Sequence, residues 1–386
     1  MNWILLGVLG TVAILLAGLV LVRRRTPKPV PAPVPVRQRR AVAVDTGADI
    51  VPVPAEAPAT EVAEQAPLPP ALGVFWLAEE HEILPDRAAQ IGERLRQIVM
   101  PPRGVQRFMS ADIMANDASR ELAELVMSEP RLAAKVLGRA NSPLYGLQMP
   151  ITSVPHAITY LGMNAVRSMA LSFLLEESFT ADDPQLRQYY DSIWDSGLFA
   201  SELCSLLAGK LGLGDTGALC TQTVLSFLGD LAAPALLGER AREVRNLTLL
   251  QRLHFEQETI GASAVLLGTI MMRAWGLPGA IIDAVAATGR VLVSPVTQLA
   301  PEHAVRAGLS YACARIGEAI AQQRIEHAEQ IDLLGDESPE LHHLQGYLRL
   351  PALARLPQQL QTPELRLALM RMIGAARNEA TTAASS

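Results

Sequence analysis

Apolar positions between residues 128 and 162 repeat with the period of a helix on both sides of a short break. Pro130 suits the first turn of the first helix, because its missing N–H group costs nothing there. Pro143 disfavours helical geometry at Ser142 and therefore ends this helix. A second, unbroken helix is predicted over 153–179. The two apolar faces consist of Leu132, Ala133, Val136, Leu137 and Ala140, then of Ala157, Ile158, Leu161, Ala165, Val166 and Met169.

The chain after Val74 is almost wholly helical in pattern. No stretch alternates between apolar and polar residues with period two, as a half-buried strand would. Further helices are predicted over 87–99, 118–127, 186–211, 218–228, 256–275, 280–287 and 305–322, with shorter ones to about 378. Apolar residues make up 49% of the chain and aromatic residues only 4%, which favours an all-α protein with a substantial core over a β-sandwich.

Near the N-terminus lies a run of twenty apolar or small uncharged residues, Trp3 to Val22. At about 1.5 Å per residue, a helix of this length spans about 30 Å, the thickness of the hydrocarbon core of a bilayer. Three arginines (23–25) follow directly, whereas a cleavable signal peptide carries its positive charge before the apolar run. An uncleaved anchor is therefore expected, with the N-terminus outside and the rest of the chain inside. The small residues Ala13 and Ala17 leave open a homodimer through the membrane.

Composition divides the chain into five parts. Eleven prolines lie between residues 26 and 70, and those at alternate positions over 27–35 favour an extended polyproline segment. The later part of this linker is rich in Ala, Glu, Thr and Pro and is expected to be disordered. The expected parts are a transmembrane anchor with its basic stop (1–25), a Pro/Ala-rich linker (26–72), a helical domain (73–300), a C-terminal helical extension (301–378) and a disordered tail (379–386).

Charge is divided unevenly along the chain. Residues 1–40 hold seven basic residues and no acidic one, whereas the remainder holds 26 basic and 39 acidic residues. An acidic body disfavours binding to nucleic acid, which needs a basic surface to meet the phosphates. The cysteines Cys204, Cys220 and Cys313 are distant in sequence and odd in number. They fit neither a disulfide framework nor a zinc site, so buried free thiols are expected.

Several short elements of the first hairpin occur in a characteristic order. They are Glu129-Pro130-Arg131-Leu132, Leu137-x-x-Ala140-Asn141-Ser142, Tyr145-Gly146, Ile151-x-Ser153, Ala157-Ile158 and Leu161-Gly162, with Trp275-Gly276-Leu277-Pro278 far downstream. This order resembles the signature of the HDOD family, a branch of the HD-type helical domains of bacterial signalling proteins. The resemblance implies an HD/HDOD-like helical fold and a regulatory role through protein–protein contacts, often linked to cyclic dinucleotides.

The same resemblance identifies where metal ligands would lie. Active HD-type phosphohydrolases hold divalent metal with a His on one helix, a His-Asp pair on another and a later Asp. The corresponding positions here are Ser196 for the first His, Gly229 and Asp230 for the pair, Ser263 or Ala264 for a later His, and Thr288 and Gly289 for a His-His pair. Only Asp230 keeps a ligand type, and one carboxylate cannot hold a catalytic metal alone. The sequence therefore predicts no catalytic residue, no metal site and no cofactor.

Ten residues of the matching segments are candidates for a structural or partner-binding role. They are Pro130, Asn141, Ser142, Tyr145, Gly146, Leu161, Gly162, Asp230, Trp275 and Pro278. Two interpretations of Asn141 stay open: its amide either fixes the hairpin or contacts a ligand or partner. The seven histidines, including the pair His342-His343, show no spacing typical of metal ligands.

These features predict a membrane-anchored, catalytically inactive HDOD signalling protein. We expect it in a bacterial inner membrane, with its helical domain in the cytoplasm and an unidentified protein as its partner. One alternative is a divergent HD-type phosphohydrolase that acts on nucleotides or phosphodiesters and that would contain stoichiometric metal. A further alternative is a membrane adaptor that binds no ligand.

Overall fold

The computed structural model describes residues 67–98, 119–141, 149–176, 179, 181 and 183–384. The chain divides into two units, residues 1–62 and 63–386, and the described residues belong to the second. The expected anchor over 3–22, the linker up to residue 66, and the candidates Ser142, Tyr145 and Gly146 lie outside the described residues. Within the described part, the stretch Thr216–Asn246 is long and apolar enough to cross a membrane. However, 89% of its most apolar window is buried in the protein, as in the core helix of a soluble protein.

All secondary structure in the described residues is helical, which confirms the all-α prediction. The N-terminal elements are α2 (Pro70–Gly73), the 3₁₀ helix η1 (Glu80–Glu82), α3 (Pro85–Gln97), α6 (Ser119–Ser128), α7 (Pro130–Ala140) and α8 (Val154–Leu161). The central elements are α9 (Met163–Glu176), α10 (Pro184–Leu211), α11 (Thr216–Leu225), α12 (Leu228–Leu237), η3 (Gly238–Asn246), α13 (Leu249–Thr259), α14 (Ala264–Ala274), α15 (Gly279–Arg290), η4 (Val296–Gln298) and α16 (Pro301–Ala321). The C-terminal elements are η5 (Ala328–Gln330), η6 (Pro339–Leu341), α17 (Leu344–Tyr347), α18 (Leu356–Leu360) and α19 (Pro363–Ala384).

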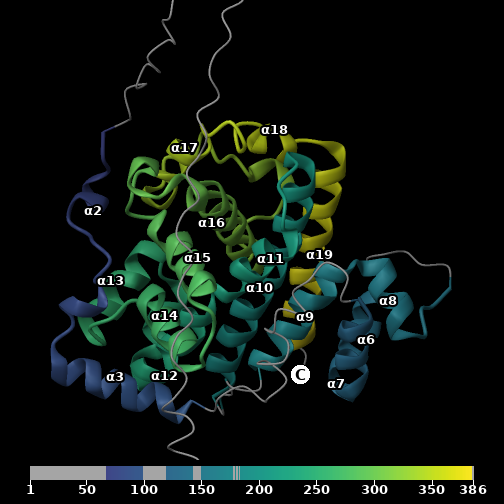
Figure 1. Ribbon diagram of the computed structural model, residues 1–386, viewed down its shortest axis with the longest axis horizontal. Helices are drawn as coiled ribbons and strands as arrows, with labels where there is room; N and C mark the ends of the chain where they lie inside the picture. Colours follow the sequence, from purple (N-terminus) through teal and green to yellow (C-terminus); the bar gives the residue numbers. More distant parts are fainter. Residues whose placement is uncertain are drawn as a thin grey trace, which may run out of the picture. The chain divides into compact units, whose positions relative to one another are not determined.

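Helix α10 lies at the centre of the fold, in contact with α9, α11 and α16 (Figure 1). Its side chains are buried on several faces, because apolar residues occupy positions all round the helix. The most extensive contact among the described helices is the one between α10 and α16. Gly317 of α16 permits this close approach, since a Cβ atom there would lie 2.6 Å from the backbone oxygen of Ser196 on α10. The first helix after residue 300 therefore packs directly on the central helix.

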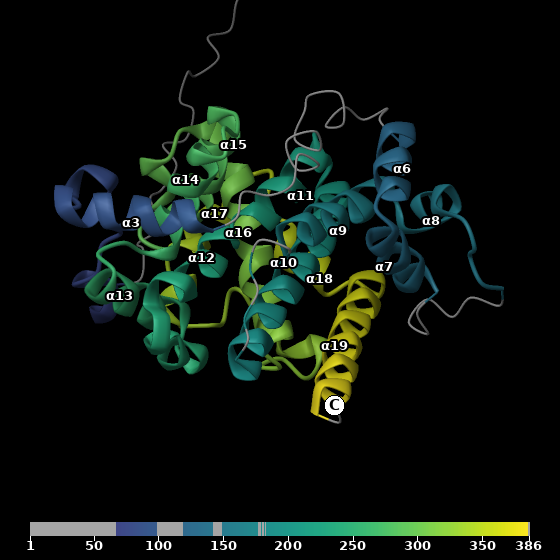
Figure 2. The same ribbon diagram turned by 90° about the horizontal axis from the view of Figure 1, so that it is seen from below.

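Helices α6, α7 and α8, which we call the hairpin lobe, pack on one another and on α9 (Figures 1 and 2). The apolar pattern predicts a single helix over 153–179, but the structure has two helices, α8 and α9. Gly162 separates them with φ +86° and ψ 145°, a conformation that is essentially restricted to glycine. The apolar stripe continues past this break because Ile158 on α8 and Val166 on α9 are both buried in the core. The prediction of one continuous helix was therefore wrong at Gly162.

Glycine also divides the helix that the pattern predicts over 256–275. Gly261 lies between α13 and α14 with φ +89°. A Cβ atom at this position would lie 2.9 Å from the side chain of Arg87 on α3, so the bend also makes room for a neighbouring helix. At the other end of the chain, α19 continues to Ala384. The tail predicted as disordered over 379–386 is therefore helical through most of its length.

Residues 74–82, which we call the N-terminal strap, are joined by side chains to α13, α14 and α15. The side-chain amide of Gln257 on α13 accepts a hydrogen bond from the N–H of Ala78 and donates one to the carbonyl of Trp76, each at 2.9 Å. The amide thus pairs with one backbone N–H and one backbone C=O of the strap, which are the groups that a neighbouring β-strand would otherwise pair with. Two ion pairs join the strap to α15 and α14, namely Glu79–Arg290 at 2.7 Å and Glu80–Arg273 at 2.5 Å.

Candidate functional site

Asp230 lies in the first turn of α12, where charged side chains of both signs are buried together. The Arg252 guanidinium places Nη2 2.8 Å from Asp230 Oδ1 and donates from Nη1 to Glu318 Oε1 at 2.8 Å. Its Nε lies 3.9 Å from Glu256 Oε1. Arg315 forms a second ion pair with Glu318. We call these five side chains the buried charge cluster.

Three helices supply the buried charge cluster. Asp230 comes from α12, Arg252 and Glu256 from successive turns of α13, and Arg315 and Glu318 from one turn of α16. A fourth helix is joined to them because the backbone N–H of Ala264, the first residue of α14, donates to Glu256 Oε2 at 2.6 Å. The cluster therefore fixes the mutual positions of α12, α13, α14 and α16.

Burial sets the protonation states within the cluster. It raises the pKa of Glu256 to about 8, although Arg252 opposes this shift. Burial would also raise the pKa of Glu318, but Arg315 and Arg252 outweigh it and hold that pKa at about 2. The pKa of Asp230 is raised, by burial and by Glu318, against the opposing effect of Arg252. At neutral pH Glu256 is then protonated, whereas Glu318 is a carboxylate that faces the guanidinium groups of Arg252 and Arg315.

Position 229, where the family resemblance places the His of the His-Asp pair, has no room for a side chain because the backbone of α14 lies against it. Helices α12 and α14 cross at Gly229 and Gly268, where their main chains touch. A Cβ atom on Gly229 would lie 1.7 Å from the backbone oxygen of Ala264, and one on Gly268 would lie 3.1 Å from the nitrogen of Gly229. A histidine at position 229 is therefore incompatible with this helix crossing.

The remaining expected ligand positions are occupied by short neutral side chains or by glycine. Ser196 donates to the carbonyl of Ser192 within α10 at 2.5 Å. Thr288 accepts a hydrogen bond from the Gln222 amide at 2.9 Å. A Cβ atom on Gly289 would lie 2.5 Å from the side chain of Val265. These residues offer no additional strong metal ligand.

Four of the expected positions do converge in space. Asp230, Ala264, Thr288 and Gly289 line one cavity of about 40 Å³. This volume suits an ordered water rather than a substrate. Within the part of the chain that the structure describes, no group of three or more His, Cys, Asp or Glu side chains could hold a metal ion. The residues present therefore do not fit the divalent metal of an HD-type centre.

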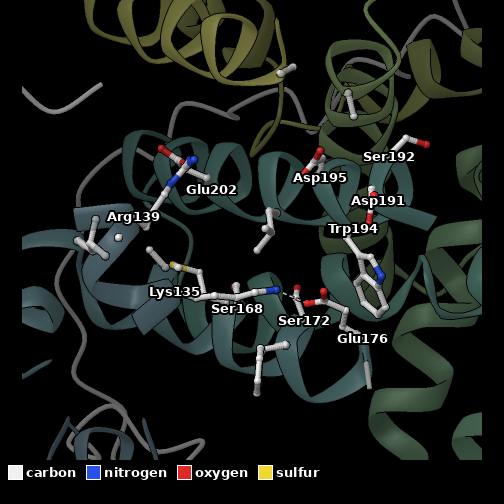
Figure 3. A pocket seen from close by; sticks show the side chains of 18 of the residues that line it. Lys135, Arg139, Ser168, Ser172, Glu176, Asp191, Ser192, Trp194, Asp195 and Glu202 are labelled. Carbon is white, nitrogen blue, oxygen red and sulfur yellow. Dashed lines mark hydrogen bonds and ion pairs between the residues drawn. The ribbon is translucent and has the colours of Figure 1, made fainter. Parts of the chain in front are cut away.

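A much larger opening, which we call the lobe cleft, lies between α7 of the hairpin lobe and helices α9 and α10 (Figure 3). Its volume of about 800 Å³ is within the range of small-molecule sites. The apolar part of its lining includes Leu161, Met169, Phe173, Trp194 and Leu198. The charged part consists of Lys135, Arg139, Glu176, Asp191, Asp195 and Glu202. The cleft thus combines an apolar wall with ionic groups of both signs.

Two ion pairs cross the lobe cleft. Lys135 on α7 pairs with Glu176 on α9, as the dashed line in Figure 3 marks. One turn further along α7, Arg139 Nη2 lies 3.1 Å from Glu202 Oε2 on α10. Lys135 Nζ also lies 5.3 Å from the centre of the Phe173 ring. Because both ion pairs are partly exposed, each contributes at most about 1 kcal/mol.

Asn141, at the C-terminal end of α7, joins the two arms of the hairpin. Its Nδ2 donates to the carbonyl of Leu137 at 2.9 Å and to that of Ile151 at 2.7 Å. Its Oδ1 accepts from the backbone N–H of Ile151 at 2.6 Å. Both hydrogen-bonding groups of the amide are therefore engaged with backbone, which supports the structural interpretation of this residue.

The downstream tetrapeptide 275–278 forms the end of α14. Gly276 has φ +72°, and its N–H donates to the carbonyl of Arg273 at 3.0 Å. The N–H of Leu277 reaches back to the carbonyl of Met272 at 3.0 Å. This pair of hydrogen bonds is the Schellman arrangement, which requires glycine at the left-handed position. The motif therefore has a local structural cause.

The candidate residues that the structure describes do not form a single site. Pro130, Asn141, Leu161 and Gly162 belong to the hairpin lobe and its junction with α9, Asp230 belongs to the buried charge cluster, and Trp275 and Pro278 belong to the end of α14. Leu161 lines the lobe cleft, and Asp230 lines the small cavity. Sequence reasoning missed the other four members of the cluster. The one local signal was opposite charge four residues apart, as in Arg252 and Glu256.

All three cysteines are buried free thiols, as predicted. The Cys220 thiol on α11 donates to the carbonyl of Ser201 on α10 at 3.6 Å. Hydrogen bonding to Cys204 and burial raise the pKa of the Cys220 thiol. A protonated, buried thiol is a poor nucleophile, so this group is a packing element.

Comparison with known proteins identifies the family. The HDOD domain matches residues 98–291, which make up half of the chain. No curated protein matches the chain. Among solved structures, a candidate signal transduction protein from Marinobacter aquaeolei VT8 is 19% identical, over 76% of this chain and 65% of its own, with a TM-score of 0.52. A candidate phosphohydrolase from Shewanella amazonensis SB2B is 17% identical, over 74% of this chain and 97% of its own, with a TM-score of 0.49.

An HDOD domain protein of unknown function from Geobacter sulfurreducens is also similar, at 16% identity over 81% of this chain and 92% of its own, with a TM-score of 0.44. At these identities, the likeness to the Marinobacter structure bears on the fold alone. The family match covers the hairpin lobe and helices α9 to α15, including the central helix α10, and ends before α16. The chain belongs to the HDOD domain family.

Proposed function

We propose that this protein is a membrane-anchored HDOD signalling protein that acts through protein–protein contacts and does not hydrolyse phosphodiesters. Family membership supports the signalling role. The apolar run over 3–22 and the arginines at 23–25 support an anchor in a bacterial cytoplasmic membrane with the helical domain inside. A link to cyclic-dinucleotide signalling is part of this proposal and comes from the family resemblance.

The proposal that the protein does not hydrolyse phosphodiesters rests mainly on the crossing of α12 and α14 at Gly229. Hydrolysis at an HD-type centre requires a metal-bound water or hydroxide beside the phosphodiester. Here the Ala264 backbone fills the place of one ligand, and the Arg252 guanidinium engages the carboxylate of Asp230. The adjoining cavity of about 40 Å³ has no room for a phosphodiester. These contacts support the proposal that the protein does not hydrolyse phosphodiesters.

An activity and metal assay tests this proposal. Full-length protein, purified in mild detergent, would be analysed for Mn, Fe and Zn and assayed with bis(p-nitrophenyl) phosphate and cyclic dinucleotides in the presence of Mn²⁺ or Mg²⁺. We expect no stoichiometric metal and no turnover above that of the heat-unfolded protein. The matched variant is Thr288→Val, which alters the small cavity while preserving side-chain size. Turnover by the wild-type protein that this variant abolishes would establish the divergent phosphohydrolase instead.

The anchor is tested separately by fractionation of host membranes. We expect the full-length protein to remain in the membrane fraction after an alkaline carbonate wash, and a variant that lacks residues 3–22 to move to the soluble fraction. Persistence of the shortened variant in the membrane would contradict the anchor.

Calorimetric titration of the full-length protein with cyclic dinucleotides tests whether they bind to it. No heat of binding would remove the cyclic-dinucleotide link and leave the role in protein contacts intact.

A further inference from the structure

The Arg252 guanidinium is surrounded by carboxyl groups on all three of its nitrogen atoms. Nη2 faces Asp230 on α12 and Nη1 faces Glu318 on α16, each at 2.8 Å. Nε faces Glu256 on its own helix, α13, at 3.9 Å. The Arg252 side chain is only 3% exposed, and none of its three partners exceeds 10%. A single cation thus joins three helices inside the core.

This cation is paired with the carboxylate at one of the positions where the family resemblance places a metal ligand. Asp230 is the one residue that keeps a metal-ligand type at an expected position, and its carboxylate oxygen is bound directly by Arg252. The position before it, Gly229, is closed by the backbone of α14. Isolated buried carboxylates are strongly disfavoured, so Asp230 and Glu318 need a positive charge between them. The guanidinium meets this need with fixed, planar N–H donors.

We propose that the guanidinium of Arg252 supplies the positive charge that a divalent metal supplies at the corresponding place in HD-type domains. A side chain, instead of a metal, then joins α12, α13 and α16. This inference goes beyond the proposed function, because it concerns how the fold is held and is independent of any partner. Its consequence is a signalling domain whose folding does not depend on divalent cations.

Two substitutions separate the charge of Arg252 from its packing. Arg252→Lys keeps a positive charge, whereas Arg252→Met keeps length and apolar packing without charge. In thermal unfolding of the full-length protein in detergent, followed by near-UV circular dichroism, we expect Arg252→Met to lower Tm by roughly 10 °C or more. Arg252→Lys should lower Tm by clearly less than Arg252→Met does. The matched control, Arg96→Met, removes an exposed arginine paired with Glu93 and should change Tm by no more than about 2 °C. A Met variant as stable as the Lys variant would overturn the proposal.

Chemical rescue provides an independent measurement. Millimolar methylguanidinium should raise the Tm of Arg252→Ala above its value in equimolar NaCl, because the ion can enter the space left by the side chain. The same addition should leave the wild-type protein and Arg96→Ala unchanged. Absence of rescue in a folded Arg252→Ala protein would contradict the inference.

The wild-type protein gives a decisive result even if the Arg252 variants do not fold. Its Tm should be the same in EDTA, in Mn²⁺ and in Mg²⁺, since the cation of the cluster is covalently part of the chain. A rise in Tm with Mn²⁺, or stoichiometric metal that EDTA removes with loss of stability, would overturn the proposal.

Discussion

Replacement of Gly229 by alanine adds one methyl group at the crossing of α12 and α14. That group would lie 1.7 Å from the backbone oxygen of Ala264, whereas a Cβ atom normally stays at least about 3.0 Å from any neighbouring heavy atom. The helices must therefore separate locally by more than 1 Å, and backbone cannot move aside as a flexible side chain does. Overpacking of this kind costs about 3 kcal/mol, the upper end of the usual range. Alanine regains about 1 kcal/mol in helix propensity, which leaves a net loss of about 2 kcal/mol.

This loss would be measured as a shift in Tm by circular dichroism of the full-length protein. For a domain of this size, 2 kcal/mol corresponds to a decrease of about 4–8 °C. Gly209→Ala is the matched control, because Gly209 also lies in a helix but a Cβ atom there would have nothing within 4 Å. It should raise Tm slightly through helix propensity alone. The Tm of Gly268→Ala should lie between those of Gly229→Ala and Gly209→Ala, because a Cβ atom on Gly268 would have its nearest contact at 3.1 Å. A Gly229→Ala protein as stable as Gly209→Ala would refute the argument from the helix crossing.

Three further substitutions test other parts of the structure. The folded protein keeps a proton on Glu256 up to about pH 8, whereas the unfolded chain releases it near pH 4.5, so this residue lowers stability as pH rises through that interval. Glu256→Gln should therefore gain stability relative to wild type between pH 5 and pH 8, by on the order of 3–5 kcal/mol in denaturant titrations, and a constant difference across this range would contradict the shifted pKa. Asn141→Ala should cost about 1–3 kcal/mol of stability and accelerate amide hydrogen exchange at Ile151, because the N–H and C=O groups of Ile151 both lose their partner. Unchanged exchange would argue against the role of Asn141 in joining the hairpin. Gly162→Ala should cost about 1–3 kcal/mol in chemical unfolding because of its positive φ, and a neutral effect would mean that α8 and α9 can join without a break.

The helical architecture was largely predictable, because its main signals are local. The helix predicted over 186–211 agrees with α10, since the Asp183 side chain caps its start and Gly212, with φ +69°, ends it. The two breaks at Gly162 and Gly261 were not predictable in the same way. Apolar spacing continues across both, and the sign of φ at a glycine depends on how the flanking helices pack.

The candidate site was predictable only in part. The motif identified Asp230 as a retained position, but not the partners that determine its state. Arg252 and Glu318 are 66 residues apart in the chain and meet only through the packing of α12, α13 and α16. Charged residues in helices usually face solvent, so sequence alone gives little reason to bury them. The lobe cleft was missed for the same reason, because its ion pairs join residues of α7 to α9 and α10.

The N-terminal strap has a mechanical consequence. Its hydrogen bonds and ion pairs to α13, α14 and α15 all involve residues 76–80, and the two hydrogen bonds of Gln257 come first along the chain, so tension ahead of residue 74 would reach them before the ion pairs. Gln257, which holds the strap, directly follows Glu256 in α13. The side chain that holds the strap and a member of the buried charge cluster are therefore consecutive residues of one helix.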